Sequence, residues 1–355
     1  MGRDPLISKL PVTIISGFLG SGKTTLISKL VRHPAMNRVA VIINEIGEIG
    51  IDHDLVSMSS ENVSLLSNGC LCCSVRSDLQ ETLRSLYSDR RAGRIPDFDR
   101  VVLETTGLAD PAPVIQTLST DMMLVAQFRF DGLVTLVDGA HGIETLAAQT
   151  EAVKQVSVAD KLLITKSDLT NSSDLRKLKE LLASLNPQAS QQTVIQGVID
   201  PSEILQLGLS TRQASEAYRR LFNSSIDEHE SSDPVREYNG RYLGLSPKRH
   251  PSGIETFSLT FTEPFKWDAF SSALELLTSI RGADLLRVKG IVNVEGRPLV
   301  IQGVQHIFHP TLELDGWPSE NQNSRIVFIA RKLRPDSILA LFEASRNLQT
   351  PLSED

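Results

Sequence analysis

The stretch GFLGSGKTT, residues 17–25, decides the fold. It matches the pattern G-x-x-x-x-G-K-[ST] and stands between an apolar run, residues 9–16, and a helix-forming segment, residues 23–31. Glycines let backbone N–H groups turn inward around a pyrophosphate, and the partial positive charge of a helix N-terminus adds to the attraction. The sequence therefore predicts a phosphate-binding loop. A Gly-rich turn that binds nothing is the weaker alternative, because the full pattern and its context agree.

Within this loop, two side chains carry expected roles in phosphate transfer. Lys23 is expected to reach the β and γ phosphates of a bound nucleotide, and the hydroxyl of Thr24 to ligate Mg²⁺. We expect Gly17 to open the loop at the end of the apolar run. The phosphate loop alone specifies neither the base of the bound nucleotide nor the process that nucleotide hydrolysis drives.

The rest of the chain predicts an α/β fold followed by a smaller domain. Short apolar runs alternate with segments of helical period, which indicates βαβ units and a mostly parallel sheet flanked by helices. A polar, Pro/Gly/Ser-rich segment then separates this part from a small α+β domain with a turn signal at Glu295-Gly296. We therefore predict a P-loop domain over residues 1–222, a linker over 223–253 and a C-terminal α+β domain over 254–355.

The composition excludes some classes of partner. The formal net charge is −7 and no Lys/Arg-rich run occurs, so we expect no nucleic-acid partner. No stretch approaches the roughly 18 apolar residues that span a bilayer, and the N-terminus carries no apolar signal segment. We expect a cytoplasmic protein with no membrane partner. A homo-oligomer is compatible with the sequence.

Two further stretches narrow the nucleotide. VVLETTG, residues 101–107, is an apolar strand that ends in Glu104, the place where P-loop proteins hold a metal-organising acid, and Gly107 follows as a candidate γ-phosphate sensor. LLITKSD, residues 162–168, places Lys166 and Asp168 after a strand, in the order of a guanine-binding loop. Asp168 can accept hydrogen bonds from the N1–H and N2 amine of guanine, a donor pair that adenine lacks. Each stretch has a bland alternative, a buried strand followed by solvated charges.

Cys70, Cys72 and Cys73, in NGCLCCSVR, are all the cysteines of the 355-residue chain. An odd count with two adjacent thiols excludes a disulfide framework. Thiolates on one short turn after the strand at 63–66 suit a soft ion such as Zn²⁺ or Cu⁺, and three ligands leave the shell open for release. Glu45, in the Gly-rich loop NEIGEIGID, is a candidate fourth ligand. Buried small hydrophobes and a redox-sensing vicinal pair are the alternatives.

With GFLGSGKTT, NEIGEIGID, NGCLCC, ETTGLADP and ITKSD in this order, the sequence resembles the CobW family of P-loop GTPases, whose cousins serve nickel insertion into urease and hydrogenase. The resemblance extends to residues 254–308 and implies a GTPase-driven metallochaperone with zinc as the commonest cargo. The sequence departs from the family pattern at Thr165, where Asn is commoner and braces the guanine-binding loop. The resemblance places the nucleotide residues at Gly20, Ser21, Gly22, Lys23, Thr24, Thr25, Lys166 and Asp168 and the metal ligands at Cys70, Cys72 and Cys73, and we expect Thr165 to join the nucleotide site in place of the Asn.

Our leading hypothesis is a GTP-hydrolysing metallochaperone with Lys23, Thr24 and Glu104 at its catalytic centre. GTP, Mg²⁺ and Zn²⁺ are its expected ligands, and a client apo-metalloprotein that receives zinc is its expected partner. Because no Arg finger or water-positioning Gln is evident, slow intrinsic turnover is expected. The alternatives are a cobalt chaperone of cobalamin biosynthesis, a nucleotide-gated thiol redox sensor and a P-loop small-molecule kinase.

Overall fold

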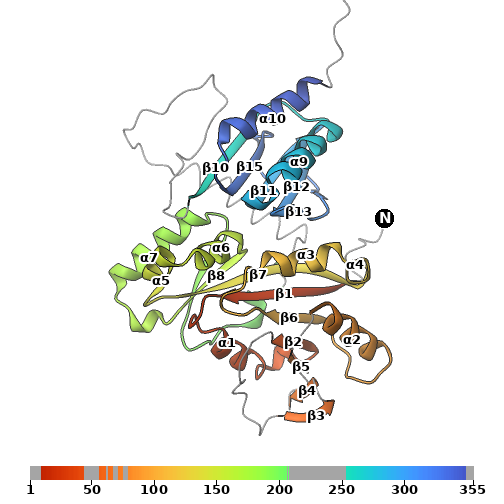
Figure 1. The fold of residues 1–355 in the computed structure, drawn as a ribbon, viewed down its shortest axis with the longest axis vertical. Helices are drawn as coiled ribbons and strands as arrows, with labels where there is room; N and C mark the ends of the chain where they lie inside the picture. The colour runs from red at the N-terminus through yellow and green to blue at the C-terminus, as the bar shows by residue number, and fades with distance from the viewer. Residues whose placement is uncertain are drawn as a thin grey trace, which may run out of the picture. The chain divides into compact units, whose positions relative to one another are not determined.

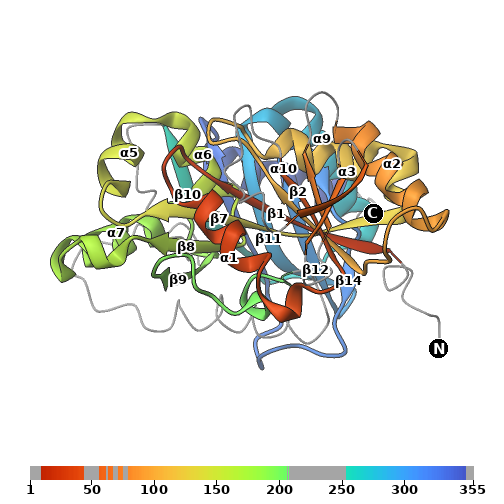
Figure 2. The same cartoon turned by 90° about the horizontal axis from the view of Figure 1, so that it is seen from below.

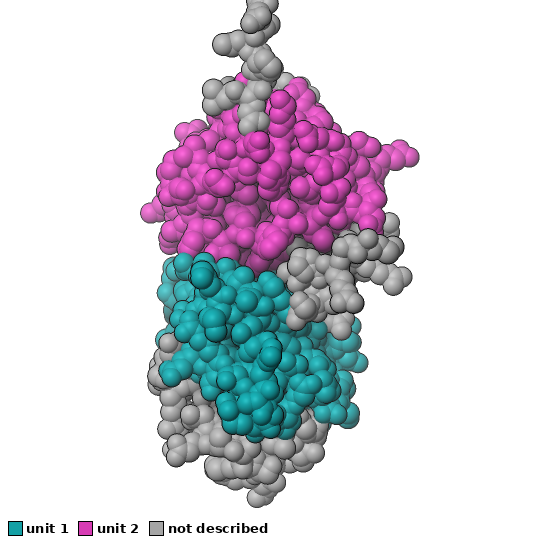
Figure 3. Space-filling view, turned by 90° about the vertical axis from the view of Figure 1, so that its right-hand side faces the viewer, with its two compact units in different colours: residues 1–183, 189–208 teal, residues 184–188, 209–355 magenta. Residues whose placement is uncertain are grey.

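A computed structural model describes residues 9–43, 56–60, 63–66, 71–74, 79–205, 207 and 253–348, and within 56–78 only the backbone of three strands. The chain divides into two compact units, one formed by residues 1–183 and 189–208 and the other by residues 184–188 and 209–355 (Figure 3). The predicted boundaries at 222/223 and 253/254 fall in or beside residues outside this description, so they stay predictions. Among the described residues, no helix is both long and apolar enough to cross a membrane.

The first unit is built on a mostly parallel sheet of order β3-β4-β5-β2-β6-β1-β7-β8-β9 (Figure 1). Along the sheet, each strand from β5 through β2, β6, β1, β7 and β8 to β9 is parallel to its neighbour. At one edge, β3 pairs antiparallel with β4, and β4 pairs antiparallel with β5. The strands are β1 (Leu10–Gly17), β2 (Val39–Ile43), β3 (Val56–Ser60), β4 (Val63–Leu66), β5 (Leu71–Ser74), β6 (Arg100–Glu104), β7 (Phe128–Asp138), β8 (Lys161–Thr165) and β9 (Ser190–Val194).

Helices cover both faces of this sheet. Figures 1 and 2 show α1 on the face opposite to α3 and α6. The helices are α1 (Lys23–Leu30), α2 (Leu79–Arg91), α3 (Ala112–Thr120), α4 (Met122–Gln127), α5 (Gly142–Ala148), α6 (Thr150–Val158) and α7 (Ser172–Leu185). Every residue of β1, β2 and β8 is buried, as expected for parallel strands with both faces covered. The predicted fold class, a P-loop α/β domain followed by a small α+β domain, is confirmed.

The second unit is an antiparallel sheet of order β10-β15-β11-β12-β13, with β14 paired to β12. Its elements are β10 (Ile254–Phe261), α9 (Trp267–Arg281), β11 (Leu285–Val294), β12 (Arg297–Val304), β13 (Ile307–Phe308), β14 (Leu312–Glu313), β15 (Ser324–Arg331) and α10 (Pro335–Leu348). The predicted turn is confirmed: Glu295 and Gly296 have φ of 52° and 86°, the left-handed pair of a type I′ hairpin turn.

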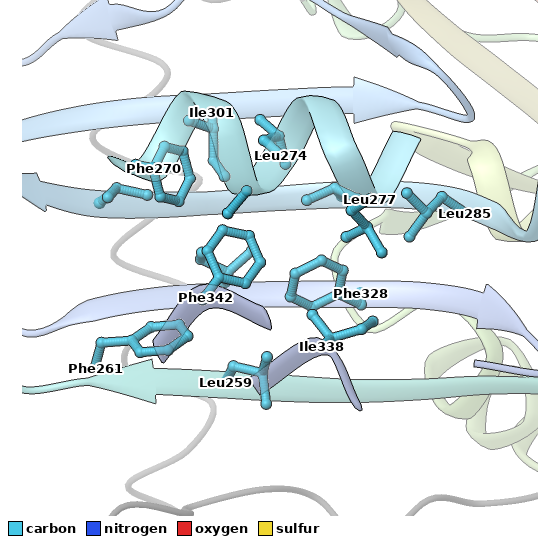
Figure 4. Close-up of a cluster of buried hydrophobic side chains, with 14 of the residues drawn as sticks. Leu259, Phe261, Phe270, Leu274, Leu277, Leu285, Ile301, Phe328, Ile338 and Phe342 are labelled. Atoms are coloured by element: carbon cyan, nitrogen blue, oxygen red, sulfur yellow. The ribbon is translucent and has the colours of Figure 1, made fainter. Parts of the chain in front are cut away.

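The core of the second unit lies between its sheet and the two helices (Figure 4). Phe270 of α9 stacks on Phe342 of α10 at a centroid distance of 5.4 Å, and both rings are fully buried. Phe328 of β15 stacks on Phe257 of β10, also at 5.4 Å. Each buried aromatic ring contributes on the order of 2–3 kcal/mol relative to an exposed one, so this unit has a core of its own.

Candidate nucleotide-binding site

The predicted site residues follow neighbouring strands of the first sheet at the edge where the parallel strands end. β1 ends at Gly17, β6 at Glu104, β7 at Asp138 and β8 at Thr165. Because β6, β1, β7 and β8 are adjacent and parallel, their carboxyl ends meet at one edge. Open α/β sheets bind their ligands at this edge. The phosphate loop, the loop after Glu104 and the base loop therefore follow neighbouring strands at one edge of the sheet.

The phosphate loop connects β1 to α1 with the geometry that its glycines allow. Gly17, Gly20 and Gly22 have φ of 148°, 75° and 94°, a region that residues with a Cβ seldom occupy. A Cβ on Gly17 would lie 2.6 Å from the carbonyl oxygen of Leu136, so this position also excludes a larger residue by contact. Gly22 is the N-cap of α1, which points the free N–H groups of the first turn toward the loop.

Lys23 lies beneath the loop and is only 6% exposed. Its ammonium Nζ donates to the carbonyl oxygens of Gly17 at 2.8 Å and Phe18 at 3.3 Å. Thr24 and Thr25 are exposed on the first turn of α1. The lysine charge is thus held within the loop, where a nucleotide phosphate is expected, and the two hydroxyl-bearing residues face outward.

Thr165 braces the phosphate loop. Its hydroxyl Oγ1 lies 2.7 Å from the carbonyl oxygen of Ser21 and 3.3 Å from that of Val137, and the residue is buried. A hydroxyl has one proton, so it donates to one of these acceptors at a time, and the shorter distance favours Ser21. The Asn that is commoner in the family has two amide protons. Thr165 therefore keeps a brace, with fewer donors than Asn would supply.

The base loop follows directly. Lys166 has a left-handed backbone with φ of 52°, and its Nζ lies 2.7 Å from Asp138 Oδ2. Burial acts to raise the pKa of Asp138, but the Lys166 ammonium and two backbone N–H groups outweigh it and lower that pKa below its usual value. The ionised carboxylate thus orients Lys166. Asp168 lies in the next turn, exposed, where it is accessible to a base.

Glu104 and Gly107 lie on the other side of the phosphate loop. Glu104 is 1% exposed and pairs in register with Ile15 of β1 and Ile43 of β2. Gly107 touches the loop: a Cβ there would lie 2.6 Å from Cδ2 and 2.9 Å from the backbone nitrogen of Leu19. The carbonyl oxygen of Gly107 accepts a hydrogen bond from Gln155 of α6. Gly107 is consequently held between α6 and the phosphate loop.

The structure corrects one detail of the predicted metal site. Cys72 and Cys73 lie on strand β5, not on a turn, with Cys72 opposite Val41 and Cys73 opposite Ile42 of β2. Cys70, Glu45 and the loop NEIGEIGID lie outside the described residues. The turn prediction failed because the pattern LCCS is short and carries no alternation that distinguishes a strand. Elsewhere in the described residues, no group of three or more His, Cys, Asp or Glu side chains is placed to hold a metal ion.

Two residues of the site were missed by sequence reasoning. Asp138 directly follows the apolar run at 133–137 and precedes Gly139; an acid at the end of an apolar run is the signal that Glu104 also shows, so Asp138 could have been found. Gln155 lies inside a helix with no motif around it, and no local pattern indicates its contact with Gly107.

Together, the parallel sheet, the Gly-rich loop at the end of β1 and the base loop after β8 define a P-loop nucleotide-binding protein. Two family models match: the CobW/HypB/UreG nucleotide-binding domain over residues 11–193 and the Cobalamin synthesis protein cobW C-terminal domain over residues 254–346. The chain belongs to the CobW/HypB/UreG family, and the predicted resemblance is confirmed.

The chain is also similar to individual members of this family over most of its length. It is 33% identical over 342 residues to the zinc chaperone YjiA of Escherichia coli, covering 96% of this chain and 100% of that protein. It is 30% identical to the zinc-regulated GTPase metalloprotein activator 1 of Schizosaccharomyces pombe, covering 86% and 78%. The crystal structure of the Zn(II)-bound YjiA GTPase superposes with a TM-score of 0.71 at 31% identity, covering 95% of this chain and 99% of that one.

Proposed function

We propose that this protein is a GTP-hydrolysing metallochaperone that holds Zn²⁺ on Cys70, Cys72 and Cys73 and transfers it to a client apo-metalloprotein under nucleotide control. The chain is a GTPase in this account, with GTP as substrate and Zn²⁺ as cargo, as the names of its relatives indicate for them. A cytoplasmic setting and slow unaided turnover belong to the same proposal.

The observation that carries the proposal is the position of β5 in the sheet. Ser74 of β5, Ile43 of β2 and Glu104 of β6 are consecutive register partners, and Cys73 precedes Ser74 directly. Adjacent strands lie about 4.8 Å apart, so the backbone of the cysteine strand is roughly 10 Å from that of Glu104. The backbone of Cys73 is therefore two strand spacings away from that of the residue at the start of the Glu104 loop. That is the contiguity a nucleotide-controlled metal site needs.

The residues at the strand ends divide the work on the nucleotide. Lys23 supplies positive charge to the phosphates, and Asp168 accepts hydrogen bonds from guanine while Lys166, oriented by Asp138, lies beside it. We expect the Gly107 amide to meet the γ-phosphate, and the close approach of Gly107 to Leu19 of the phosphate loop supports this role. Hydrolysis removes that phosphate, which releases the Gly107 loop and so alters the strand that precedes it.

The donor set fits Mg²⁺. The hydroxyl of Thr24 and the carboxylate of Glu104 are the hard oxygen ligands that Mg²⁺ prefers; Thr24 lies in the first turn of α1 and Glu104 ends β6, at the same edge of the sheet. When bound, Mg²⁺ supplies charge neutralisation of the β and γ phosphates. Glu104 is buried, so its carboxylate is shielded from bulk water and keeps its position.

Zinc is favoured over the alternatives. Cobalt and redox chemistry both use thiolates, but the relatives that cover most of this chain are named for zinc. The test is metal content: the protein purified under reducing conditions is expected to retain one equivalent of Zn²⁺ after desalting, and Cys72→Ser to lose it with GTP hydrolysis preserved. Retention of zinc by a variant with all three cysteines replaced by Ser would refute the proposed site. Rapid reversible oxidation with no metal retained would favour the redox sensor.

A further inference from the structure

Gln155 joins helix α6 to the loop that follows Glu104. Its side chain is fully buried, and its amide Nε2 donates to the carbonyl oxygens of Gly107 at 3.1 Å and Ala109 at 2.9 Å. One amide group thus uses both of its protons on a single loop. Helix α6 itself packs against β1 and β7, so the amide is anchored on the central strands of the sheet.

The same loop is fixed at its ends by other groups. The backbone N–H of Thr105 donates to the carbonyl oxygen of Ile15 at 2.9 Å, and Asp110 Oδ1 accepts from the N–H of Ala112 at 3.0 Å. Between these ends, Gln155 binds the middle of the loop and Gly107 lies against the backbone of Leu19 in the phosphate loop. Gln155 therefore helps to hold Gly107 against the phosphate loop.

A small cavity extends this connection to the phosphate loop. It measures about 20 Å³, and its lining includes Gln155, Ser21 and Thr135. Within the described part of the chain, Gln155 Oε1 and Ser21 Oγ are buried and have no hydrogen-bond partner. The volume suffices for one buried water, and unsatisfied buried polar atoms are what such waters bind. The cavity thus has a polar residue of α6 and a polar residue of the phosphate loop in its lining.

We infer that Gln155 is a positioning residue for GTP hydrolysis: it holds the Gly107 loop against the phosphate loop and makes turnover and the preference for GTP over GDP depend on helix α6. The inference rests on the proposed GTPase activity. Its physical basis is that a loop sensing the γ-phosphate must be placed before the phosphate arrives, since hydrogen bonds formed only on binding require ordering of the loop.

The test compares Gln155→Met with the wild type. Methionine has a similar length and fills the buried site but donates no hydrogen bond, so the carbonyls of Gly107 and Ala109 lose their partner. We expect kcat to fall about tenfold and affinity for a non-hydrolysable GTP analogue to fall by a similar factor, with GDP affinity within about twofold of the wild type. Ser157→Ala is the matched control, because Ser157 is equally buried on α6 and its hydroxyl bonds Val153 of the same helix. Ser157→Ala is expected to change neither kcat nor the ratio of the affinities for the GTP analogue and GDP.

A purely structural role would lower affinity for both nucleotides in parallel, and that result would overturn the inference. So would kcat and nucleotide preference that stay within twofold of the wild type. If Gln155→Met does not fold, Gln155→Glu undergoes the same comparison, because its carboxylate keeps the length but repels both carbonyls when ionised. Wild-type behaviour of a folded Gln155→Glu protein would refute the inference. A wild-type protein that binds GTP without hydrolysing it would refute the proposed function instead, and the affinity ratio alone would then decide the role of Gln155.

Discussion

Replacing Thr165 by Val tests how the phosphate loop is braced. Valine has the shape of threonine, so it removes the hydroxyl without opening a cavity. The buried carbonyl of Ser21, 2.7 Å from Oγ1, then loses its side-chain donor. A buried acceptor left unsatisfied costs about 1–3 kcal/mol. For a domain of this size, each kcal/mol lowers Tm by about 2–4 °C, so we expect a decrease of roughly 2–12 °C.

The nucleotide readout follows from the same contact. Ser21 is central in the phosphate loop, so a loosened loop must be ordered on binding, and GDP affinity is expected to fall about five- to tenfold, near 1–1.4 kcal/mol. Thermal unfolding and fluorescent-GDP titration of Thr165→Val measure both effects. Thr165→Ser keeps the hydroxyl and is expected to retain most of the affinity. If Thr165→Val matched the wild type in Tm and GDP affinity, the brace would have no energetic role.

Three further perturbations probe the strand ends. Gly107→Ala places a Cβ 2.9 Å from the backbone nitrogen of Leu19, so the two loops must move apart at a cost of about 1–3 kcal/mol. Turnover assays should then show slower GTP hydrolysis, and unchanged turnover would show that the close approach of Gly107 to Leu19 does not matter for hydrolysis. Asp168→Asn should weaken GDP binding about 10–100-fold and shift preference toward xanthosine diphosphate in competition titrations; unaltered preference would remove Asp168 from the base site. Asp138 has a lowered pKa, so its contribution to stability is present above about pH 4 and is lost as pH falls through its folded-state pKa. Asp138→Asn cannot titrate at this position, so thermal unfolding should show a smaller loss of stability between pH 5 and pH 3 than in the wild type. An equal loss in both proteins would exclude a stabilising ion pair between Asp138 and Lys166.

Local patterns predicted the parts of the site that are local in the sequence. The phosphate loop could be predicted because its glycine spacing, its lysine and the strand and helix around it all lie within residues 9–31. The hairpin turn at Glu295-Gly296 could be predicted for the same reason, since a two-residue turn specifies its own backbone. The strand end at Glu104 and the strand end that precedes Asp168 followed from the alternation of strands and helices.

Contacts between distant segments could not be predicted in this way. Gln155 contacts Gly107 across 48 positions of sequence, and Lys166 contacts Asp138 across 28 positions. Neither contact produces a local sequence pattern that could predict it. Helices α5 and α6 are separated at Gln149, where φ is −119° and ψ is 113°, and neither Gly nor Pro marks this break in the sequence. Packing on the sheet, which the sequence pattern does not encode locally, decides such breaks.

The central claim is that the nucleotide controls the metal site, and zinc affinity measures it most directly. The assay is competition with a chromogenic chelator under reducing conditions, with GTP-Mg²⁺ or GDP-Mg²⁺ present and Cys72→Ser as the control. We predict a difference of at least about tenfold between the two nucleotide states, equivalent to about 1.4 kcal/mol of coupling, that disappears in the control. Equal zinc affinities in the two states of the wild-type protein would contradict the account.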